Sequence, residues 1–256
     1  MKQFDELVAI MQRLRDKESG CPWDLQQTYE SLKPHLIEET YEVIEAIEKK
    51  DYQALKEELG DLLLHIVFQS KMAEENGHFN IKDVLIKINK KMINRHPHIF
   101  SDKKVESAED VVQNWEKIKK KEKKHRKSIL DEIPKGIPAL IKAKRVQQKA
   151  SAVGFDWKAA EPIFDKLQEE IKEFQSAYQE NDSQEMEYEI GDILFTIVNI
   201  ARQLNIDSEF ALQKSVEKFI QRFKLMENYL NEENKDISKC GLNELEILWE
   251  RAKKKA

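Results

Sequence analysis

Residues 38–42 read Glu-Glu-Thr-Tyr-Glu and residues 58–61 read Glu-Leu-Gly-Asp, and the same carboxylate spacing returns further along the chain. Residues 169–173 read Glu-Glu-Ile-Lys-Glu and residues 189–192 read Glu-Ile-Gly-Asp, so each acidic position is displaced by 131 residues. The matching carboxylates are Glu38, Glu39, Glu42, Glu58 and Asp61 in the first copy, and Glu169, Glu170, Glu173, Glu189 and Asp192 in the second. Five matches at one offset indicate an internal duplication.

Each copy reads as two antiparallel helices joined by a short turn. Apolar residues at helical spacing mark the second helix of each copy, and we expect this stripe to pack inward. They are Leu55, Leu59, Leu62, Leu63 and Ile66 in the first copy, and Met186, Ile190, Ile193, Leu194 and Ile197 in the second. Asp51 and Asp182 stand where each second helix starts, as N-caps do. The pattern predicts an all-α fold made of helix pairs, the building block of a four-helix bundle.

The composition supports two helical domains. The chain has 256 residues, of which 40% are hydrophobic and 36% charged, with only 7 Gly and 6 Pro to interrupt helices. A basic run at 119–127, followed by Pro134, Gly136 and Pro138, predicts a solvated linker between the copies. We therefore expect domains at 1–120 and 138–256, separated by a linker at 121–137.

Charge and cysteine content argue against several classes of protein. A formal net charge of -5 disfavours a nucleic-acid partner, because such proteins concentrate positive charge. Cys21 and Cys240 show neither metal-ligand spacing nor a disulfide framework, which favours a reducing compartment. The sequence has no signal peptide and no apolar run long enough to span a membrane, so a cytoplasmic location without a membrane partner is expected.

The repeated carboxylates predict a metal site in each copy. Glu38, Glu39 and Glu42 share one quadrant of their helix, and Glu58 and Asp61 flank the apolar stripe of the next. Two carboxylates about 5 Å apart repel by roughly 3 kcal/mol at an effective dielectric near 20, so their convergence requires a cation. Oxygen ligands select a hard divalent ion such as Mg²⁺ or Mn²⁺. The alternative, a solvated acidic face, would explain one such pattern better than it explains two.

Taken together with its flanking segments, this pattern resembles the MazG family of all-α nucleoside triphosphate pyrophosphohydrolases over nearly the whole chain. The supporting segments are Cys21-Pro22-Trp23-Asp24, Arg95-His96-Pro97-His98 and Val153-Gly154-Phe155-Asp156-Trp157. The resemblance implies hydrolysis of NTPs or dNTPs to the monophosphate and pyrophosphate in nucleotide-pool house-cleaning. It also implies dependence on Mg²⁺, with Mn²⁺ as a substitute, and a homodimer that completes the helical bundles.

Substrate contacts are expected in the second copy, where the resemblance gives a role to several residues outside the carboxylates. Lys218 and Arg222 lie one helical turn apart, as do Trp249 and Lys253, which suits cations on the phosphates and an aromatic ring for the base. Their first-copy counterparts are Lys91, Arg95, Trp115 and Lys119. Alternatively, these cations face solvent and the tryptophan belongs to the hydrophobic core. Trp157 joins the expected substrate-binding set.

Asn199 is expected to contact base or sugar in the second copy only, because the first copy has Phe68 at that position. A local hydrogen-bond partner is the alternative role for such a helix-borne Asn. We expect Glu169, Glu170, Glu173, Glu189 and Asp192 to be catalytic, with all ten carboxylates as metal ligands. His65 becomes Thr196 in the second copy, so a structural role is predicted for it.

Two further functions remain open at this point. One is a narrower enzyme of the same superfamily, acting on dUTP, dCTP or phosphoribosyl-ATP. The other is a non-catalytic helical regulator whose carboxylates bind a structural ion.

Overall fold

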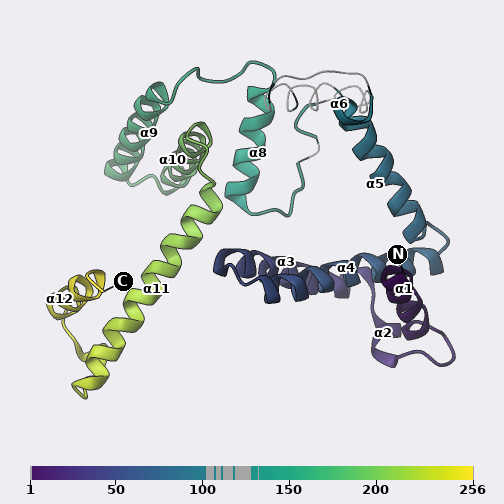
Figure 1. Cartoon of the computed structure of the whole chain (residues 1–256). Helices are drawn as coiled ribbons and strands as arrows, with labels where there is room; N and C mark the ends of the chain where they lie inside the picture. The colour runs from purple at the N-terminus through teal and green to yellow at the C-terminus, as the bar shows by residue number, and fades with distance from the viewer. Residues whose placement is uncertain are drawn as a thin grey trace. The chain divides into compact units, whose positions relative to one another are not determined.

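The computed structural model describes residues 2–101, 107, 111, 118, 128–131 and 133–255, and the chain divides into two compact units. The units are Met1–Glu122 and Lys123–Ala256, each carrying one copy of the repeat. Trp115, Lys119 and residues 121–127 of the predicted linker lie outside the described residues, so the linker boundaries stay a prediction. Every regular element that the structure describes is helical, which confirms the all-α prediction (Figure 1).

The first unit is built on a long antiparallel helix pair, α3 and α4, which pack along each other. Its helices are α1 (Lys2–Leu14), α2 (Pro22–Gln26), α3 (Tyr29–Lys49), α4 (Tyr52–Glu75), α5 (Ile81–Arg95) and α6 (Pro97–Phe100). The second unit repeats this arrangement with α9 and α10 as its central pair. Its elements are α8 (Ala139–Ser151), α9 (Glu161–Glu180), α10 (Ser183–Gln203), α11 (Ser208–Glu232), the 3₁₀ turn η1 (Ile237–Lys239) and α12 (Leu242–Lys253).

Both central pairs are joined by the same two-residue device. Lys50 and Asn181 adopt left-handed backbone conformations, with φ of 55° and 56°, and so end α3 and α9. The side chain of Asp51 then accepts hydrogen bonds from two backbone N–H groups of α4, and Asp182 does the same for α10. The predicted N-caps are confirmed, and the turn is tight enough to return each helix directly along its predecessor.

The core of the first unit lies where α1 packs on the C-terminal half of α4. The buried residues of this cluster are Met11, Leu32, Val67, Phe68 and Met72. Arg15 closes one side of it: Arg15 Nε lies 3.0 Å from Glu75 Oε1, and the guanidinium lies over the Phe68 ring, 5.3 Å from its centroid. A nearly buried cation is thus neutralised by a carboxylate and packed on an aromatic face.

In the second unit α8 takes the place of α1 and packs on α10. Gln147 Nε2 donates a 2.8 Å hydrogen bond to the backbone carbonyl of Phe195, and Lys144 pairs with Asp207 at the start of α11. A separate core joins α11 to α12 through buried Met226, Tyr229, Leu230, Leu248 and Ala252. Figure 1 shows α11 running away from the α9–α10 pair toward α12.

The prediction that the apolar stripes of α4 and α10 pack inward holds in the single chain only for Leu55 and Leu62, and for Met186 and Ile193, which are half-buried. Leu59, Leu63 and Ile66 are 51%, 38% and 47% exposed, and the matching residues of α10 are similarly uncovered. The buried face of α4 lies elsewhere, at His65, Val67, Phe68, Met72 and Ala73. The helices that pack on α4 and α10 cover the carboxylate seam and the buried face but leave part of the apolar stripe uncovered. Each unit therefore presents an unpartnered apolar face.

Among the described residues no helix is long and apolar enough to cross a membrane.

Candidate metal centres and their surroundings

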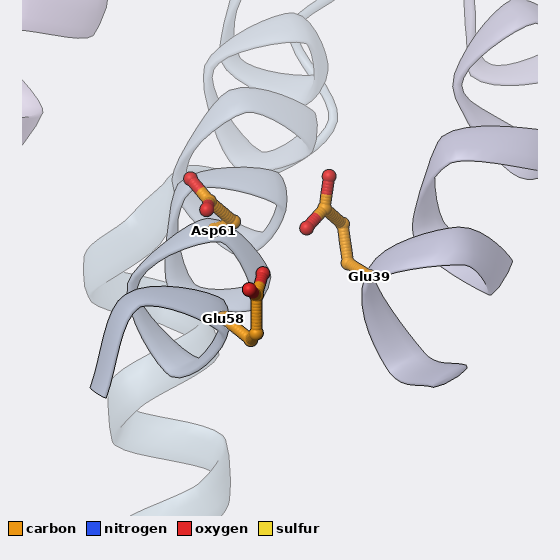
Figure 2. A group of neighbouring side chains, drawn as sticks. All are labelled: Glu39, Glu58 and Asp61. Atoms are coloured by element: carbon orange, nitrogen blue, oxygen red, sulfur yellow. The ribbon is translucent and has the colours of Figure 1, made fainter. Parts of the chain in front are cut away.

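The first copy brings three carboxylates together across the seam between α3 and α4. Glu39 comes from α3 and Glu58 and Asp61 from α4, and one oxygen of each lies within 4.8 Å of the other two. Figure 2 shows Glu39 extending from α3 toward α4, the helix that carries Glu58 and Asp61. All three are partly buried.

Crowding changes the acidity of this cluster. Partial burial raises the pKa of Glu39, and the charges of Asp61, Glu42 and Glu58 raise it further. The pKa of Glu58 is raised by partial burial and then by Glu42 and Asp61. Glu42 therefore belongs to the cluster electrostatically, although it is not among the three converging ligands.

The second copy assembles Glu170, Glu173 and Glu189, again with oxygens within 4.8 Å of one another. Glu170 and Glu189 are buried, at 5% and 9% exposure, while Glu173 is exposed. Oε2 of Glu189 is buried and has no hydrogen-bond partner among the described residues. A buried carboxylate oxygen without a donor is costly, and a bound cation would satisfy it. With oxygen donors only, the cluster fits a hard divalent ion.

The pKa values of the second cluster are raised for the same reasons. Partial burial raises the pKa of Glu189, followed by the charges of Glu173 and Glu170. Although Glu173 is exposed, the loss of some hydration beside its neighbours and the charge of Glu170 likewise raise its pKa. Both clusters hold more negative charge than their surroundings neutralise.

A lysine not anticipated from the sequence compensates part of the second cluster. Lys166 Nζ lies 2.7 Å from Glu169 Oε1 and 2.8 Å from Glu170 Oε1, and these bonds raise the pKa of the lysine. The first copy has His35 at this position, 3.6 Å from Glu38. Helical i,i+3 and i,i+4 spacing could have identified Lys166 in the sequence.

The ten predicted carboxylates thus separate into two groups. The structure brings together six of them, Glu39, Glu58, Asp61, Glu170, Glu173 and Glu189. The other four lie beside these clusters: Glu38 and Glu169 face His35 and Lys166, Glu42 acts through its charge, and Asp192 lies exposed one turn beyond Glu189.

The structure places the predicted phosphate-binding group on α11 and α12, apart from the carboxylates of the same chain. The Arg222 guanidinium lies 5.8 Å from the centroid of the Trp249 ring, and Arg222 Nε is buried without a hydrogen-bond partner in the described part of the chain. Lys253 pairs with Glu250, and Lys218 is exposed. Lys218 and Arg222 belong to α11 and Trp249 and Lys253 to α12, and Figure 1 shows α11 running away from α9 and α10.

Asn199 is 5% exposed, and its partner is Arg202, a residue that the sequence pattern did not single out. Trp157 is 42% exposed, and its backbone carbonyl accepts a 2.9 Å hydrogen bond from Gln203 Nε2. The loop before α9 is therefore attached to the C-terminal end of α10, beside Asn199.

His65 is buried, at 8% exposure, and no partner for its Nδ1 occurs among the residues described. Burial and the neighbouring His35 lower its pKa, while Asp61 opposes this shift. A neutral, packed imidazole is in keeping with the predicted structural role.

Comparison with known proteins identifies both copies. The model of a family described as "MazG nucleotide pyrophosphohydrolase domain" matches residues 27–100 and 159–226. A Thermotoga maritima protein named nucleoside triphosphate pyrophosphohydrolase/pyrophosphatase MazG is 48% identical over 251 residues, covering 98% of this chain and 95% of the relative. An Escherichia coli K12 protein named nucleoside triphosphate pyrophosphohydrolase is 42% identical over 258 residues, covering 99% and 98%.

The raised pKa values predict how stability depends on pH without a bound cation. Between the ordinary glutamate pKa of 4.5 and the raised folded values, the folded chain binds more protons than the unfolded chain. The free energy of unfolding should therefore fall as pH rises through this window and level off above it. Denaturant unfolding in the presence of a chelator should show this decrease in the free energy of unfolding. Mg²⁺ at pH 7 should raise the free energy of unfolding again, by about 2.7 kcal/mol at a concentration 100 times its dissociation constant.

Glu189→Gln should reduce both the decrease in the free energy of unfolding with pH and its increase on addition of Mg²⁺, because the substitution removes one of the crowded charges. Glu232→Gln, which changes an exposed glutamate outside the clusters, is the matched control and should leave both unchanged. A wild-type stability that rises through this pH window would contradict the prediction.

Proposed function

Because the chain belongs to the MazG family of nucleotide pyrophosphohydrolases, we propose that it cleaves nucleoside triphosphates between the α- and β-phosphates at the second carboxylate cluster. The products are a nucleoside monophosphate and pyrophosphate, which is the chemistry of nucleotide-pool house-cleaning. Two matched domains and full-length relatives of 48% and 42% identity support this activity. The observation that carries the assignment of the site is the buried, unpartnered Oε2 of Glu189 beside Glu170 and Glu173.

Glu170, Glu173 and Glu189 would hold the cation, and Asp192, one turn beyond Glu189, is retained as a further ligand. We propose Mg²⁺, with Mn²⁺ as a substitute, because every donor is oxygen. A divalent ion bound there would polarise the α-phosphate and increase the acidity of the attacking water. The carboxylates also accept the proton of that water, for which the raised pKa values of Glu173 and Glu189 suit them.

No group in the cluster serves as a covalent nucleophile, so positioning and charge neutralisation dominate the chemistry. Lys166 already offsets part of the charge of Glu169 and Glu170, which makes the buried cluster more compatible with a polyanionic substrate. Lys218, Arg222 and Lys253 are proposed to bind the β- and γ-phosphates, and Trp249 to contact the nucleoside. The unpartnered Nε of Arg222 supports an anionic ligand there.

The second copy is proposed to carry most of the turnover. It alone combines a buried carboxylate cluster with Asn199, whereas the first copy places buried Phe68 at that position. In the first copy, Glu39, Glu58 and Asp61 are still proposed to bind a metal ion. That site has His35 where the second copy has Lys166.

A homodimer is proposed to cover the unpartnered apolar faces. Leu59, Leu63 and Ile66 on α4 repeat as Ile190, Leu194 and Ile197 on α10, and all six are exposed in the single chain. The exposed residues of α11 include Leu212, Val216, Phe219, Ile220 and Phe223, on the helix that carries Lys218 and Arg222. A second copy packed on these faces would bury them and enclose the phosphate-binding cations.

Hydrolysis in H₂¹⁸O should place the label in the nucleoside monophosphate, because water attacks the α-phosphate. Mass spectrometry of products separated by ion exchange measures the label. Labelled pyrophosphate, or release of orthophosphate with a nucleoside diphosphate, would show attack at another phosphorus. Metal-dependent stabilisation without any turnover would favour the regulator over the enzyme.

Changing Glu170 and Glu173 together to Gln should lower kcat roughly 100-fold or more, the scale of losing a preorganised electrostatic contact to a transition state. The matched double variant of the first copy, Glu39→Gln with Glu42→Gln, should lower kcat much less. Circular dichroism and thermal unfolding must first show that both variants remain folded, since removing repelling charges is itself stabilising. Equal losses in the two variants would refute the division of labour.

Light scattering at micromolar concentration should give a mass near twice the 30.2 kDa of one chain. Replacing Leu194 and Ile197 by Glu should shift the protein toward the monomer, because two charges would be buried in the apolar interface. Tyr52→Glu, at a residue that is 75% exposed, is the control for added surface charge. An active wild-type monomer at that concentration would exclude the proposed dimer.

A further inference from the structure

Arg202 holds two partners at the C-terminal end of α10. Its Nε and Nη2 donate hydrogen bonds of 3.1 and 2.6 Å to Oδ1 of Asn199, and its Nη1 donates one of 3.0 Å to Oδ2 of Asp156. A further bond joins Nη2 to Asp156 Oδ1. The side chains are mostly buried, at 12% exposure for Arg202 and 21% for Asp156. Although burial alone would raise the pKa of Asp156, the hydrogen bonds from Arg202 and Ser151 hold it below its usual value.

The guanidinium determines how the amide of Asn199 is oriented. Arginine offers only donors, so the carbonyl oxygen of the amide must face it and the amide nitrogen must face the other way. A free Asn can turn either its oxygen or its nitrogen toward a ligand, but this one is clamped by two charge-assisted hydrogen bonds. Asn199 can therefore present only N–H donors to a ligand.

The clamped amide lies on the same stripe of α10 as Asp192, a proposed metal ligand. Asp192 and Asn199 are seven residues apart, which places them on one stripe of α10 and about 10 Å apart along its axis. The same end of α10 holds the loop of Trp157, through Gln203 and Arg202. The backbone of Trp157 is thus held at the same end of α10 as the amide donor, and its half-exposed indole would serve as a base-stacking surface.

The first copy builds the corresponding corner differently. Phe68 stands in place of Asn199, and the arginine is Arg15, which directly follows the end of α1, packs over the Phe68 ring and pairs with Glu75. The guanidinium there donates to the backbone carbonyl of Asp24 rather than to a side-chain amide. This corner anchors α2, which precedes α3, but offers no amide to a ligand.

We propose that Arg202 is a positioning residue for base selection, which makes the second copy prefer bases that present a carbonyl oxygen over bases that present an amino group. This inference rests on the proposed function. Uracil, thymine, guanine and hypoxanthine accept from the Asn199 amide at the exocyclic position where cytosine and adenine carry an NH₂ donor. With cytosine or adenine, the N–H of Asn199 would face the NH₂ group of the base, so that neither donor would find an acceptor in this contact.

Two matched nucleotide pairs isolate this contact: UTP against CTP, and ITP against ATP, differ by one carbonyl or amino group. For the wild type, kcat/KM should favour the carbonyl member by about tenfold, the equivalent of one hydrogen bond, mainly through KM. Arg202→Met frees the amide to turn, so both ratios should approach one while kcat changes little. Asn199→Asp presents an acceptor in place of the donor, so preference should shift toward CTP and ATP.

Control variants separate amide orientation from anchoring of the loop. Asp156→Ala removes the other partner of Arg202 and should change KM for all four nucleotides alike, leaving their ratios intact. Arg15→Met disrupts the corresponding corner of the first copy and should also preserve them. Inhibition by inorganic tripolyphosphate, which has no base, should be the same in wild type and Arg202→Met. If Arg202→Met is unfolded by circular dichroism, Asn199→Asp decides, because it retains a partner for Arg202.

Wild-type ratios near one, ratios unchanged in Arg202→Met, or no shift of Asn199→Asp toward CTP would each overturn the inference. A wild type without turnover would refute the proposed function instead. In that case, calorimetric binding of the α,β-methylene analogues of UTP and CTP still tests the base preference by itself.

Discussion

Crowding of carboxylates between two antiparallel helices is the constraint on which the rest of the molecule depends. Each seam brings three acidic side chains within 4.8 Å, and the pKa values of Glu39 and Glu58 in one copy, and of Glu173 and Glu189 in the other, are raised accordingly. A fold that keeps such an arrangement sacrifices stability at neutral pH unless a cation is supplied. The carboxylates are thus better explained as a functional feature than as a stabilising one.

The turn between the helices sets the register of this crowding. Lys50 is equally distant in sequence from Glu42 and Glu58, and Asn181 is equally distant from Glu173 and Glu189. In an antiparallel pair, residues equally far from the turn lie opposite each other, which agrees with the rise that Glu42 causes in the pKa of Glu58 and that Glu173 causes in the pKa of Glu189. The left-handed residue and the Asp N-cap that follows it therefore do more than end one helix and start another. They decide which carboxylates share a site.

The duplicated scaffold has been specialised in two directions. The second copy neutralises part of its cluster with Lys166 and buries Asn199 against Arg202, whereas the first has His35 and Phe68 at these places. Both copies anchor the segment that precedes their first carboxylate helix with a mostly buried arginine, but this arginine directly follows α1 in one copy and belongs to α10 in the other. The same structural requirement is met in both, and only the second solution leaves an amide available to a ligand.

The sequence by itself determined the repeat, the helical class, the N-caps and most of the carboxylate set, because these depend on local spacing and on one constant offset. It could not show which carboxylates converge: Glu170, Glu173 and Glu189 meet, while Asp192 lies beside them, since the rotation of each helix is fixed only by packing. It also misassigned the stripe of Leu59, Leu63 and Ile66, because periodicity reports an apolar face without saying which partner covers it. The pairing of Arg202 with both Asn199 and Asp156 was decided by tertiary structure alone, because Asp156 is 46 residues away and reaches Arg202 only when its loop packs on α10.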